Sequence, residues 1–436
     1  MILKTLEKLR YFLFWLKNRV ARSGLSAQCN DVKFIQDNPN STSAIHARDE
    51  HLKKILRHAI ETVPHYKNYS IDTPLSNFEV VNKKLITSHK KAFESVTYSN
   101  KSKIPVSTSG STGTPFEVYQ NLNKKTRNTA DVMYFSKLVN FNVGERLYYW
   151  RHWNEHYQKN KNLLFIQNIV PINVFDLNDE RFETILRQLK NDKSSKHFIG
   201  YASAFEKLCK FLDKNNGHLV EGIKIKSVIA ISEPLTNYTK ERMGKYFNAP
   251  IVSRYSNTEN GILAQQDYPN SDKFIINQAS YNLEILDMEK NIPVPNGTLG
   301  RIVVTDFFNY CMPLIRFDTG DLGVMQTING IDVLSKIVGR KSDVIFNTKN
   351  EEVTSLIALD FSMYKGLLEG QIIQNGAKEY VLKLHVDNAF DKEKELLEKF
   401  RLYFGEDALI TINYVESIPL LKSGKRKLAI NNYIKN

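Results

Sequence analysis

Strand-like and helical segments alternate through the middle of the chain, and this alternation constrains the fold more than any other feature. Apolar β-type runs occur at 147–150, 163–170, 196–201, 225–231 and 249–255. Helical patterns of ten or more residues lie between several of them, near 179–191, 203–215 and 236–247. Strands separated by helices of this length form sheets with parallel pairs, because a parallel crossover needs a long connection. The sequence therefore predicts an α/β fold.

Two other patterns follow this α/β segment. From about residue 280, closely spaced strand-like runs and turn signals predict an antiparallel, barrel-like region. Past Arg340 the order is strand, helix, strand, which is typical of a small α+β domain. With 436 residues the chain exceeds what one core usually fills. We expect a helix and linker over 1–43, a large domain with mixed sheets flanked by helices and a barrel-like subdomain over 44–338, and a small domain over 339–436.

Composition narrows the environment and the partners. The three cysteines, Cys29, Cys209 and Cys311, lie far apart and form no zinc or disulfide pattern, which favours a reducing, cytoplasmic location. No apolar run is long enough to cross a bilayer. The formal net charge of +13 suits polyanions such as nucleotides or acidic lipids. A dense basic tract with interleaved aromatic residues is absent, so we expect no nucleic-acid partner.

The first 22 residues form a basic amphipathic pattern. Helical spacing places one apolar set on a common face, namely Ile2, Leu6, Leu9, Leu13, Leu16 and Val20. Lys4, Lys8 and Arg19 lie on the other side with Tyr11 and Trp15. Such a helix can lie in the interface of a membrane, which would hold the protein at the inner face, or it can pack on its own domain. Both interpretations stay open at this point.

A patch of glycine and hydroxyl residues lies between two β-type runs in the segment IPVSTSGSTGTPFEVYQ, residues 104–120. It consists of Thr108, Ser109, Gly110, Ser111, Thr112, Gly113 and Thr114. Side chains this small allow backbone N–H groups to converge on a polyphosphate. The Walker pattern GxxxxGK[ST] is absent. A flexible hairpin loop is the alternative interpretation.

Three later segments carry charged side chains that suit a nucleotide. Thr258 and Glu259 directly follow a β-type run, at the strand end where α/β sheets bind ligands, and Glu259 could hold Mg²⁺. Asp321, in an acidic turn, could accept hydrogen bonds from both hydroxyls of a ribose, or be a solvated turn residue. Lys425, in a loop after Gly424, could neutralise a phosphate or carboxylate, or belong to a solvated basic tail.

In this order the segments resemble the adenylate-forming enzymes, the superfamily of acyl-CoA synthetases, peptide-synthetase adenylation domains and luciferases. The motifs that carry the resemblance are the loop at 107–114, Tyr-x-x-Thr-Glu at 255–259, Arg-Phe-Asp-Thr-Gly-Asp at 316–321, Gly-Arg at 339–340 and Ser-Gly-Lys at 423–425. Within the superfamily the chain is similar to the phenylacetate-CoA ligase group and its capsular-polysaccharide relatives. The segments that match this group are 58–69, 77–86, 199–208 and 231–236.

The resemblance implies how ATP would be bound. The loop Thr108–Thr114 would hold the β- and γ-phosphates. Asp321 and Arg340 would hold the ribose. The residues implied for the adenine pocket are Ser232, Glu233, Pro234 and Tyr255.

It also implies the reaction. A carboxylate would attack the α-phosphorus of ATP and release pyrophosphate, with Thr258 at the α-phosphate and Glu259 on Mg²⁺. Lys425, on a mobile C-terminal lid domain, would bridge the carboxylate and the α-phosphate. Phe116 stands where family members often have a lysine, so backbone amides are expected to carry more of the phosphate binding. We expect an AMP-forming ligase that activates a small carboxylic or amino acid.

The acceptor of the activated acid is less constrained. No glycine occurs between Arg340 and Gly366, where CoA-forming relatives carry a glycine-containing loop. This disfavours the thioester step and favours transfer to a sugar or amine. The resemblance to the capsular-polysaccharide relatives implies modification of a surface polysaccharide. An acyl-CoA ligase is the alternative, and the use of CoA stays open. A third interpretation is an inactive nucleotide-binding scaffold at the membrane surface, held there by residues 1–22.

Overall fold

The structure is a computed structural model that describes residues 2–108, 116–153, 160–215, 217–267, 272–340, 345–353, 355–419, 421 and 427–433. The chain forms two compact units. The first unit consists of Met1–Gly144 and Arg254–Ile337, and the second unit of Glu145–Ser253 and Val338–Asn436. Each unit therefore combines segments that are far apart in the sequence. The domain limits expected from the sequence stay a prediction.

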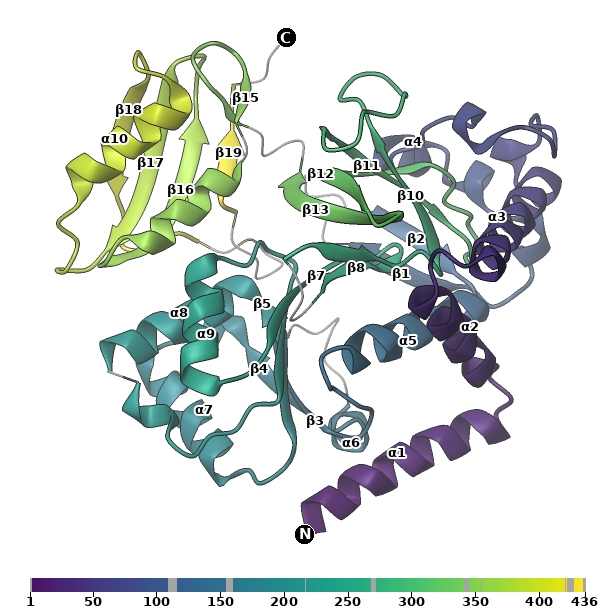
Figure 1. Cartoon of the computed structure of the whole chain (residues 1–436), viewed down its shortest axis with the longest axis horizontal. Helices are drawn as coiled ribbons and strands as arrows, with labels where there is room; N and C mark the ends of the chain where they lie inside the picture. Colours follow the sequence, from purple (N-terminus) through teal and green to yellow (C-terminus); the bar gives the residue numbers. More distant parts are fainter. Residues whose placement is uncertain are drawn as a thin grey trace. The chain divides into compact units, whose positions relative to one another are not determined.

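The predicted α/β alternation builds the first half of the second unit. Parallel pairing joins β3 (Arg146–Arg151) to β4 (Ile169–Asn173) and β5 (Lys196–Tyr201), and β5 to β6 (Ser227–Ile231). The connecting helices are α7 (Asp179–Asn191), α8 (Ala202–Lys214) and α9 (Asn237–Phe247), which lie beside these strands in Figure 1. Asn178 and Thr236 cap α7 and α9 by accepting hydrogen bonds from the first-turn N–H groups.

One predicted strand is partly wrong. Of residues 163–170, only the end belongs to a strand, because α6 (Lys161–Ile166) precedes β4. Asn160 begins this helix, since its side chain accepts a hydrogen bond from the N–H of Asn162 at 2.9 Å. Phe165 and Ile166 are exposed, so the apolar run that indicated a buried strand does not enter the core. Apolar periodicity alone does not separate a short helix from a strand.

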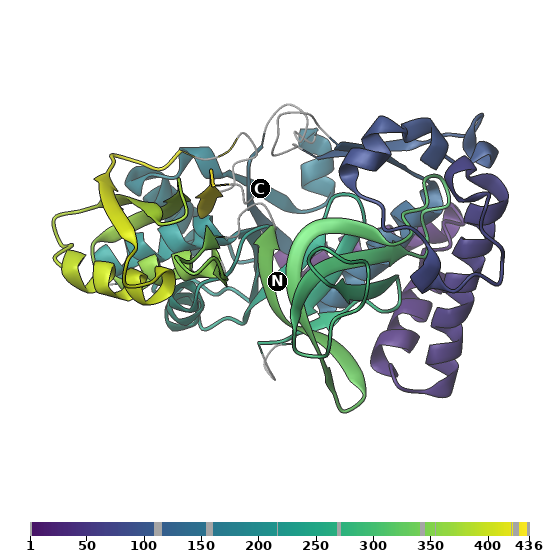
Figure 2. The same ribbon diagram turned by 90° about the horizontal axis from the view of Figure 1, so that it is seen from above.

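Antiparallel strands form most of the sheet in the first unit, in the order β10-β11-β12-β13-β9-β8-β7. Their bounds are β7 (Ile251–Asn257), β8 (Gly261–Gln266), β9 (Phe274–Ile276), β10 (Tyr281–Leu286), β11 (Leu299–Asp306), β12 (Phe317–Ile328) and β13 (Ile331–Arg340). The strands of this region are strongly curved (Figure 2). β7 begins in the second unit and ends in the first. The predicted α/β class, with a large mixed sheet flanked by helices, is confirmed.

Helices dominate the N-terminal part of the first unit. They are α1 (Ile2–Val20), α2 (Leu25–Asp37), α3 (Thr42–Thr62), α4 (Lys83–Ser88) and α5 (Leu122–Lys137). The sequence pattern did not predict α2 or α5, and α2 occupies most of the expected linker. Both contribute to a small core with Leu25, Val32, Ile35, Ala44 and Ala130. None of the described helices combines the length and apolar character that a membrane span requires.

The predicted apolar face of α1 is exposed. Leu9, Leu13 and Val20 are 48%, 50% and 75% exposed. Phe14 and Trp15, on the opposite side, pack against the core next to α2. Gly144 allows this approach, because a Cβ atom there would lie 2.4 Å from the carbonyl oxygen of Glu7. The helix therefore packs on its own domain, as one of the two open interpretations expected, but through Phe14 and Trp15 and not through the predicted apolar face.

The C-terminal part of the second unit has its own sheet, in the order β18-β17-β16-β19. The strands are β16 (Leu367–Gln374), β17 (Glu379–Val386), β18 (Leu409–Tyr414) and β19 (Ala429–Asn431), preceded by the short hairpin β14 (Ile345–Phe346) and β15 (Glu352–Val353). Helix α10 (Glu393–Phe404) packs on the sheet through Leu396, Phe400 and Phe404, which share a core with Ile372 and Leu382. The α+β character predicted for this segment is confirmed.

Candidate functional site

The turn Thr258–Asn260, called here the Glu259 turn, joins β7 to β8. Thr258 is exposed, whereas Glu259 is only 1% exposed. Gly261 ends the turn with φ of +118°. A Cβ atom at this position would lie 2.8 Å from the side-chain oxygen of Asn128, so a residue larger than glycine would displace the turn. The backbone thus holds a buried carboxylate beside an exposed hydroxyl at the end of a strand.

The carboxylate of Glu259 is short of partners. The Nζ atom of Lys83 lies 2.5 Å from Oε1 in an ion pair. Apart from this ion pair, neither oxygen has a hydrogen-bond partner among the described residues. The side-chain atoms of Asn260 also have none within the described chain. Buried polar atoms are normally satisfied, so this cluster indicates a place where a polar ligand binds.

These residues fit a magnesium ion. Mg²⁺ prefers oxygen ligands and is usually bound through one or two carboxylates together with substrate phosphates and water. Glu259 provides such a carboxylate, with both oxygens available for a hard cation. No group of three or more His, Cys, Asp or Glu in the described ranges could hold a metal ion by itself. An ion at Glu259 would therefore take its remaining ligands from phosphate and water.

A buried network of an ion pair and hydrogen bonds holds the Glu259 turn in position. Lys124, on α5, lies with its Nζ atom 2.6 Å from Oδ2 of Asp306, and both side chains are fully buried. Lys124 also donates a hydrogen bond to the hydroxyl of Tyr281 at 2.9 Å. That hydroxyl donates to the carbonyl oxygen of Asn260 at 2.6 Å. The charge pair therefore positions the turn through Tyr281.

Tyr255 and Asp321 form a second part of the site in the same unit. The hydroxyl of Tyr255 donates a hydrogen bond to Oδ2 of Asp321 at 2.8 Å. Burial, followed by the charge of Asp321, raises the pKa of Tyr255 well above its usual value, and the charge of Glu259 acts in the same direction. Tyr255 is therefore a neutral donor at physiological pH. Asp321 therefore contacts the strand β7 that leads directly into the Glu259 turn.

Asp321 lies within β12, so the prediction of a turn is wrong. Val303 pairs with Asp318 and Arg301 pairs with Leu322, which leaves residues 319–321 as a bulge. Gly320 has φ of +80°, a conformation that favours glycine. The bulge changes the direction of the Asp321 side chain at the strand edge, as bulges often do next to binding sites. The Gly-Asp pair in the sequence indicated a turn, because a turn and a bulge both need the positive φ that glycine adopts easily.

The predicted phosphate loop lies between β1 (Ile104–Thr108) and β2 (Phe116–Gln120), which pair in an antiparallel hairpin. Thr108 ends β1, and Ser109–Thr114 lie outside the described residues. From β2, the side chain of Gln120 donates a hydrogen bond to the carbonyl oxygen of Glu259 at 2.9 Å. The strand that follows the loop therefore contacts the Glu259 turn.

The remaining predicted site residues belong to the second unit or lie outside the described residues. Ser232 has φ of +70°, a strained conformation for a residue with a side chain, of the kind found at functional sites. Glu233 accepts a hydrogen bond from the N–H of Ser203 at 2.9 Å, and Pro234 follows it in the same unit. Arg340 ends β13. Lys425 lies outside the described residues.

The structure thus brings together Tyr255, Thr258, Glu259 and Asp321 with the strands that flank the phosphate loop. The sequence reasoning missed Lys83 and the buried pair of Lys124 and Asp306. A basic residue at the start of a helix and a lysine within a helix carry no sequence signal that separates them from solvated charges. Only the position of their partners reveals their roles.

A histidine cluster elsewhere resembles a catalytic triad. In the second unit, Nδ1 of His197 lies 2.8 Å from the hydroxyl of Ser227, and Nε2 lies 3.2 Å from Glu145. Both Ser227 and His197 are fully buried. A nucleophile must reach its substrate, so we interpret this cluster as a structural connection between the first ends of β3, β5 and β6.

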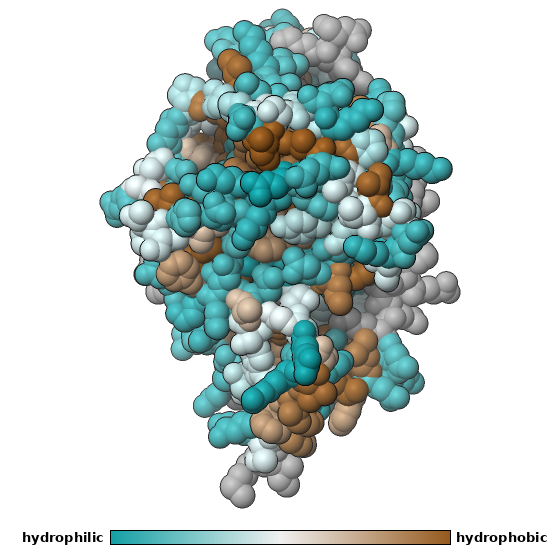
Figure 3. Space-filling view, turned by 90° about the vertical axis from the view of Figure 1, so that its right-hand side faces the viewer, coloured by the Kyte–Doolittle hydropathy of each residue, from teal (hydrophilic) through white to brown (hydrophobic). Residues whose placement is uncertain are grey.

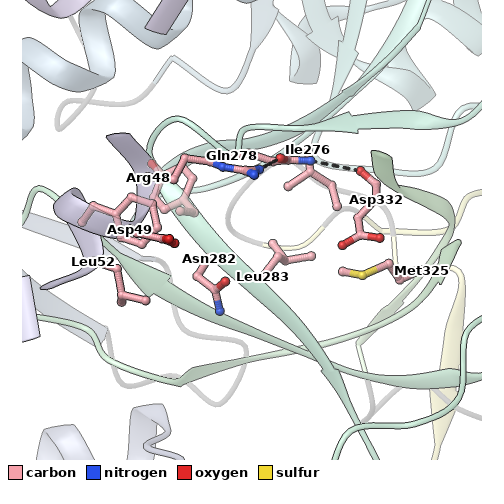
Figure 4. A pocket seen from close by; sticks show the side chains of 11 residues that line it. Arg48, Asp49, Leu52, Ile276, Gln278, Asn282, Leu283, Met325 and Asp332 are labelled. Atoms are coloured by element: carbon pink, nitrogen blue, oxygen red, sulfur yellow. Dashed lines mark hydrogen bonds between the residues drawn. The ribbon is translucent and has the colours of Figure 1, made fainter. Parts of the chain in front are cut away.

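A cavity of about 250 Å³ lies in the first unit (Figure 4). Part of its polar lining is paired within the cavity. Arg48 donates to the side-chain oxygen of Gln278, whose amide nitrogen lies 3.4 Å from the carbonyl oxygen of Asp332. None of the predicted nucleotide-binding residues lines this cavity. Tyr281, which lines the cavity, also donates a hydrogen bond to Asn260 in the Glu259 turn, so the cavity adjoins the network that supports the turn.

Comparisons with known proteins agree with this fold. Residues 347–432 match the CapK C-terminal domain family. Over 357 residues the chain is 23% identical to Protein CapK of Staphylococcus aureus, covering 76% of this chain and 74% of that protein. A crystal structure of 2-hydroxyisobutyryl-CoA ligase in the postadenylation state, in complex with 2-HIB-AMP, has a TM-score of 0.69 at 15% identity, covering 91% of this chain and 90% of that chain.

ATP-bound MatB from Rhodopseudomonas palustris is similar as well, with a TM-score of 0.54 at 16% identity, covering 74% of this chain and 66% of that chain. The fold is therefore that of the AMP-forming, adenylate-forming ligases. The chain is also similar to Protein CapK over most of its length, and its C-terminal segment matches the CapK C-terminal domain family. The resemblance predicted from the sequence motifs is confirmed.

Proposed function

We propose that the protein is an ATP-dependent ligase that activates a carboxylic or amino acid as an acyl adenylate and releases pyrophosphate. One observation carries the proposal. Asp321 accepts a hydrogen bond from Tyr255 on β7, the strand that leads into the Glu259 turn, and Gln120 of β2 connects the phosphate-loop hairpin to the same turn. This is the arrangement that a nucleotide with its metal ion requires. The AMP-forming ligase fold supports it.

The reaction joins two anions, so charge control is the main task of the site. In our proposal, Asp321 holds the ribose, with Tyr255 fixing its carboxylate, and Arg340 assists. Ser232, Glu233 and Pro234 line the adenine pocket. The small residues of the phosphate loop direct backbone N–H groups at the β- and γ-phosphates.

Three further residues act at the reacting phosphate. Glu259 would ligate Mg²⁺, which neutralises charge on the phosphate oxygens when bound. Thr258, exposed beside Glu259, would contact the α-phosphate. Lys425 would stabilise the charge that develops as the carboxylate attacks the α-phosphorus. The phosphorus–oxygen bond to pyrophosphate breaks as the bond to the carboxylate forms, without a protein nucleophile.

For the acceptor, we propose a sugar or amine of a surface polysaccharide. The likeness to Protein CapK supports this context, and the absence of glycine between Arg340 and Gly366 disfavours the loop expected in CoA-forming relatives. An acyl-CoA ligase is the alternative, supported by the fold of 2-hydroxyisobutyryl-CoA ligase. The two proposals differ in whether CoA consumes the adenylate.

The test is pyrophosphate release from ATP over a panel of small carboxylic and amino acids, with and without CoA. We expect acid-dependent release that is lost in Lys425→Ala and Asp321→Asn. Lys427→Ala, which removes a neighbouring positive charge, is the matched control and should retain activity. Release that needs no acid, or that Lys425→Ala leaves intact, would refute the mechanism. Nucleotide binding without turnover for any acid would favour the scaffold interpretation.

We also propose that α1 binds the surface of an anionic membrane. At about 100° per residue, Leu6, Leu9, Phe12, Leu13, Leu16 and Val20 span an arc of about 120°, and all of them are exposed. We call this set the apolar stripe. Hydrophobic side chains gather at the lower end of the molecule in Figure 3, where Figure 1 draws α1.

Charges on α1 complement an anionic surface. Lys8 and Arg19 flank the apolar stripe on one edge, and Arg10 and Lys17 flank it on the other. The acidic residue of the helix, Glu7, is buried against the protein. Basic side chains at the edges of an apolar stripe can reach lipid phosphates while the stripe enters the interface. An anionic bilayer therefore fits this surface better than an uncharged partner.

Co-sedimentation of the full chain with vesicles tests this second proposal. We expect binding to vesicles with phosphatidylglycerol, weaker binding to pure phosphatidylcholine, and loss of binding at high salt. Leu9→Glu combined with Leu13→Glu should abolish binding, whereas Leu122→Glu, at another exposed apolar position, should not. A lipid-free dimer that the double variant dissociates would instead identify a second copy as the partner of α1.

A further inference from the structure

Lys83 lies beside Glu259 in the candidate site, although none of the sequence motifs assigns it a function. It is the first residue of α4, which Asn82 caps by accepting a hydrogen bond from the N–H of Leu85 at 2.9 Å. Its Nζ atom lies 2.5 Å from Oε1 of Glu259 and 5.5 Å from the ring centre of Phe116. Lys83 therefore connects the Glu259 turn to Phe116, the first residue of β2, which follows the phosphate loop.

The lack of a positive side chain in the phosphate loop is the reason to expect a function for Lys83. Residues 108–115 contain no lysine or arginine, so the loop itself supplies no positive side chain to a polyphosphate. Other lysines beside the hairpin are paired elsewhere, Lys90 with Glu117 and Lys103 with Glu94. Lys83 instead pairs with the carboxylate that fits a metal ion.

Exposure differs between the two partners of the ion pair. The side chain of Glu259 is 1% exposed and that of Lys83 is 41% exposed. Glu259 cannot leave its buried position, and its charge must be balanced by a cation at all times. Lys83 has a flexible stem and reaches the solvent, so its ammonium group can turn from the carboxylate to another anion close by.

We propose that Lys83 is a phosphate-binding residue of the ATP site. Its ammonium group neutralises Glu259 in the nucleotide-free protein, and it contacts the polyphosphate of ATP once Glu259 serves as a Mg²⁺ ligand. The ring of Phe116, 5.5 Å from Nζ, attracts the ammonium group toward the start of β2. This inference rests on the proposed function and adds to it the residue that supplies the positive charge missing from the loop.

Equilibrium binding of ATP, measured by calorimetry with and without Mg²⁺, tests the inference without relying on turnover. A charged hydrogen bond to phosphate is worth about 1.5–3 kcal/mol, so Lys83→Ala should weaken binding of ATP with Mg²⁺ about ten- to hundredfold. Lys83→Arg should retain most of the affinity. The matched control is Lys84→Ala, which removes the same charge from an exposed position on the same helix and should leave affinity unchanged.

The Glu259→Gln background separates the two roles of Lys83. In the nucleotide-free protein, Lys83→Ala should lower the melting temperature when Glu259 is present and have a smaller effect when it is Gln. The loss of ATP affinity should persist in both backgrounds. If Lys83→Ala lowers only the melting temperature and leaves ATP affinity intact, the lysine is structural and the inference is wrong. If the unaltered protein binds no ATP, the proposed function itself fails.

Discussion

Breaking the buried ion pair beneath the Glu259 turn should strongly destabilise the first unit. The Nζ atom of Lys124 lies 2.6 Å from Oδ2 of Asp306, where a pair of unit charges has a Coulomb energy of about 6 kcal/mol at an effective dielectric constant near 20. Lys124→Met removes this attraction and leaves a fully buried carboxylate without its cation. Measured costs of such changes are about 3–5 kcal/mol, and we expect a loss of stability in this range.

Hydrogen–deuterium exchange on peptides from α5 and β10 is the appropriate assay, because the two units need not unfold together. A loss of 3–5 kcal/mol corresponds to exchange that is faster by about a hundredfold to several thousandfold. Lys125→Met removes the neighbouring exposed charge on the same helix and should change stability by less than about 0.5 kcal/mol.

The double variant Lys124→Met with Asp306→Leu distinguishes the value of the pair from the cost of an unpaired charge. Replacing both ions with apolar residues should restore most of the stability, since the expensive species is the uncompensated carboxylate. If Lys124→Met behaves like the Lys125→Met control, the ion pair does not support the turn and the reasoning fails. The same result would remove Lys124 from the account of how Asn260 is positioned.

Three further outcomes can be measured. Tyr255→Phe should weaken ATP binding about tenfold in calorimetry, because Asp321 loses a hydrogen bond from a neutral donor, and unchanged affinity would contradict the role of this pair. Gly261→Ala should lower the melting temperature by destabilising the fold by about 1–3 kcal/mol, since a Cβ atom would lie 2.8 Å from Asn128; an unchanged melting temperature would refute this. Burial raises the pKa of Cys29 and Cys311 to about 11 and that of Cys209 well above its usual value, which disfavours the reactive thiolate. Ellman's reagent at pH 8 should therefore label the three cysteines only after unfolding in guanidinium. Rapid labelling of the folded protein would contradict the burial.

Much of the secondary structure was predictable because it depends on neighbours in the sequence. The helices α7, α8 and α9 follow from apolar spacing, and capping residues precede α7 and α9. The strands β5 and β6 are short apolar runs that lie entirely in the core. The prediction failed at α6, where the same apolar signal belongs to a helix with exposed Phe165 and Ile166. It also missed α2 and α5, because the many polar residues of these helices leave only a weak apolar pattern in the sequence.

The candidate site was only partly predictable for the same reason. Thr258, Glu259 and Asp321 belong to recognisable motifs, and the structure joins Asp321 by a hydrogen bond to Tyr255, on the strand that leads into the Glu259 turn. The ion pair of Lys83 with Glu259 joins distant segments of the chain. No local pattern encodes it, because a lysine in a polar stretch looks the same whether it is solvated or paired.

By itself, then, the sequence determined the α/β class, the order of the motifs and the basic amphipathic character of the first helix. The tertiary structure alone decided which face of α1 packs, that Asp321 sits on a bulge, and that Glu259 is buried with a lysine as its counter-ion. The physical reason is the distance along the chain over which each kind of interaction acts. Helix periodicity and backbone freedom act over a few residues, whereas burial and charge pairing depend on which distant segments meet when the chain folds.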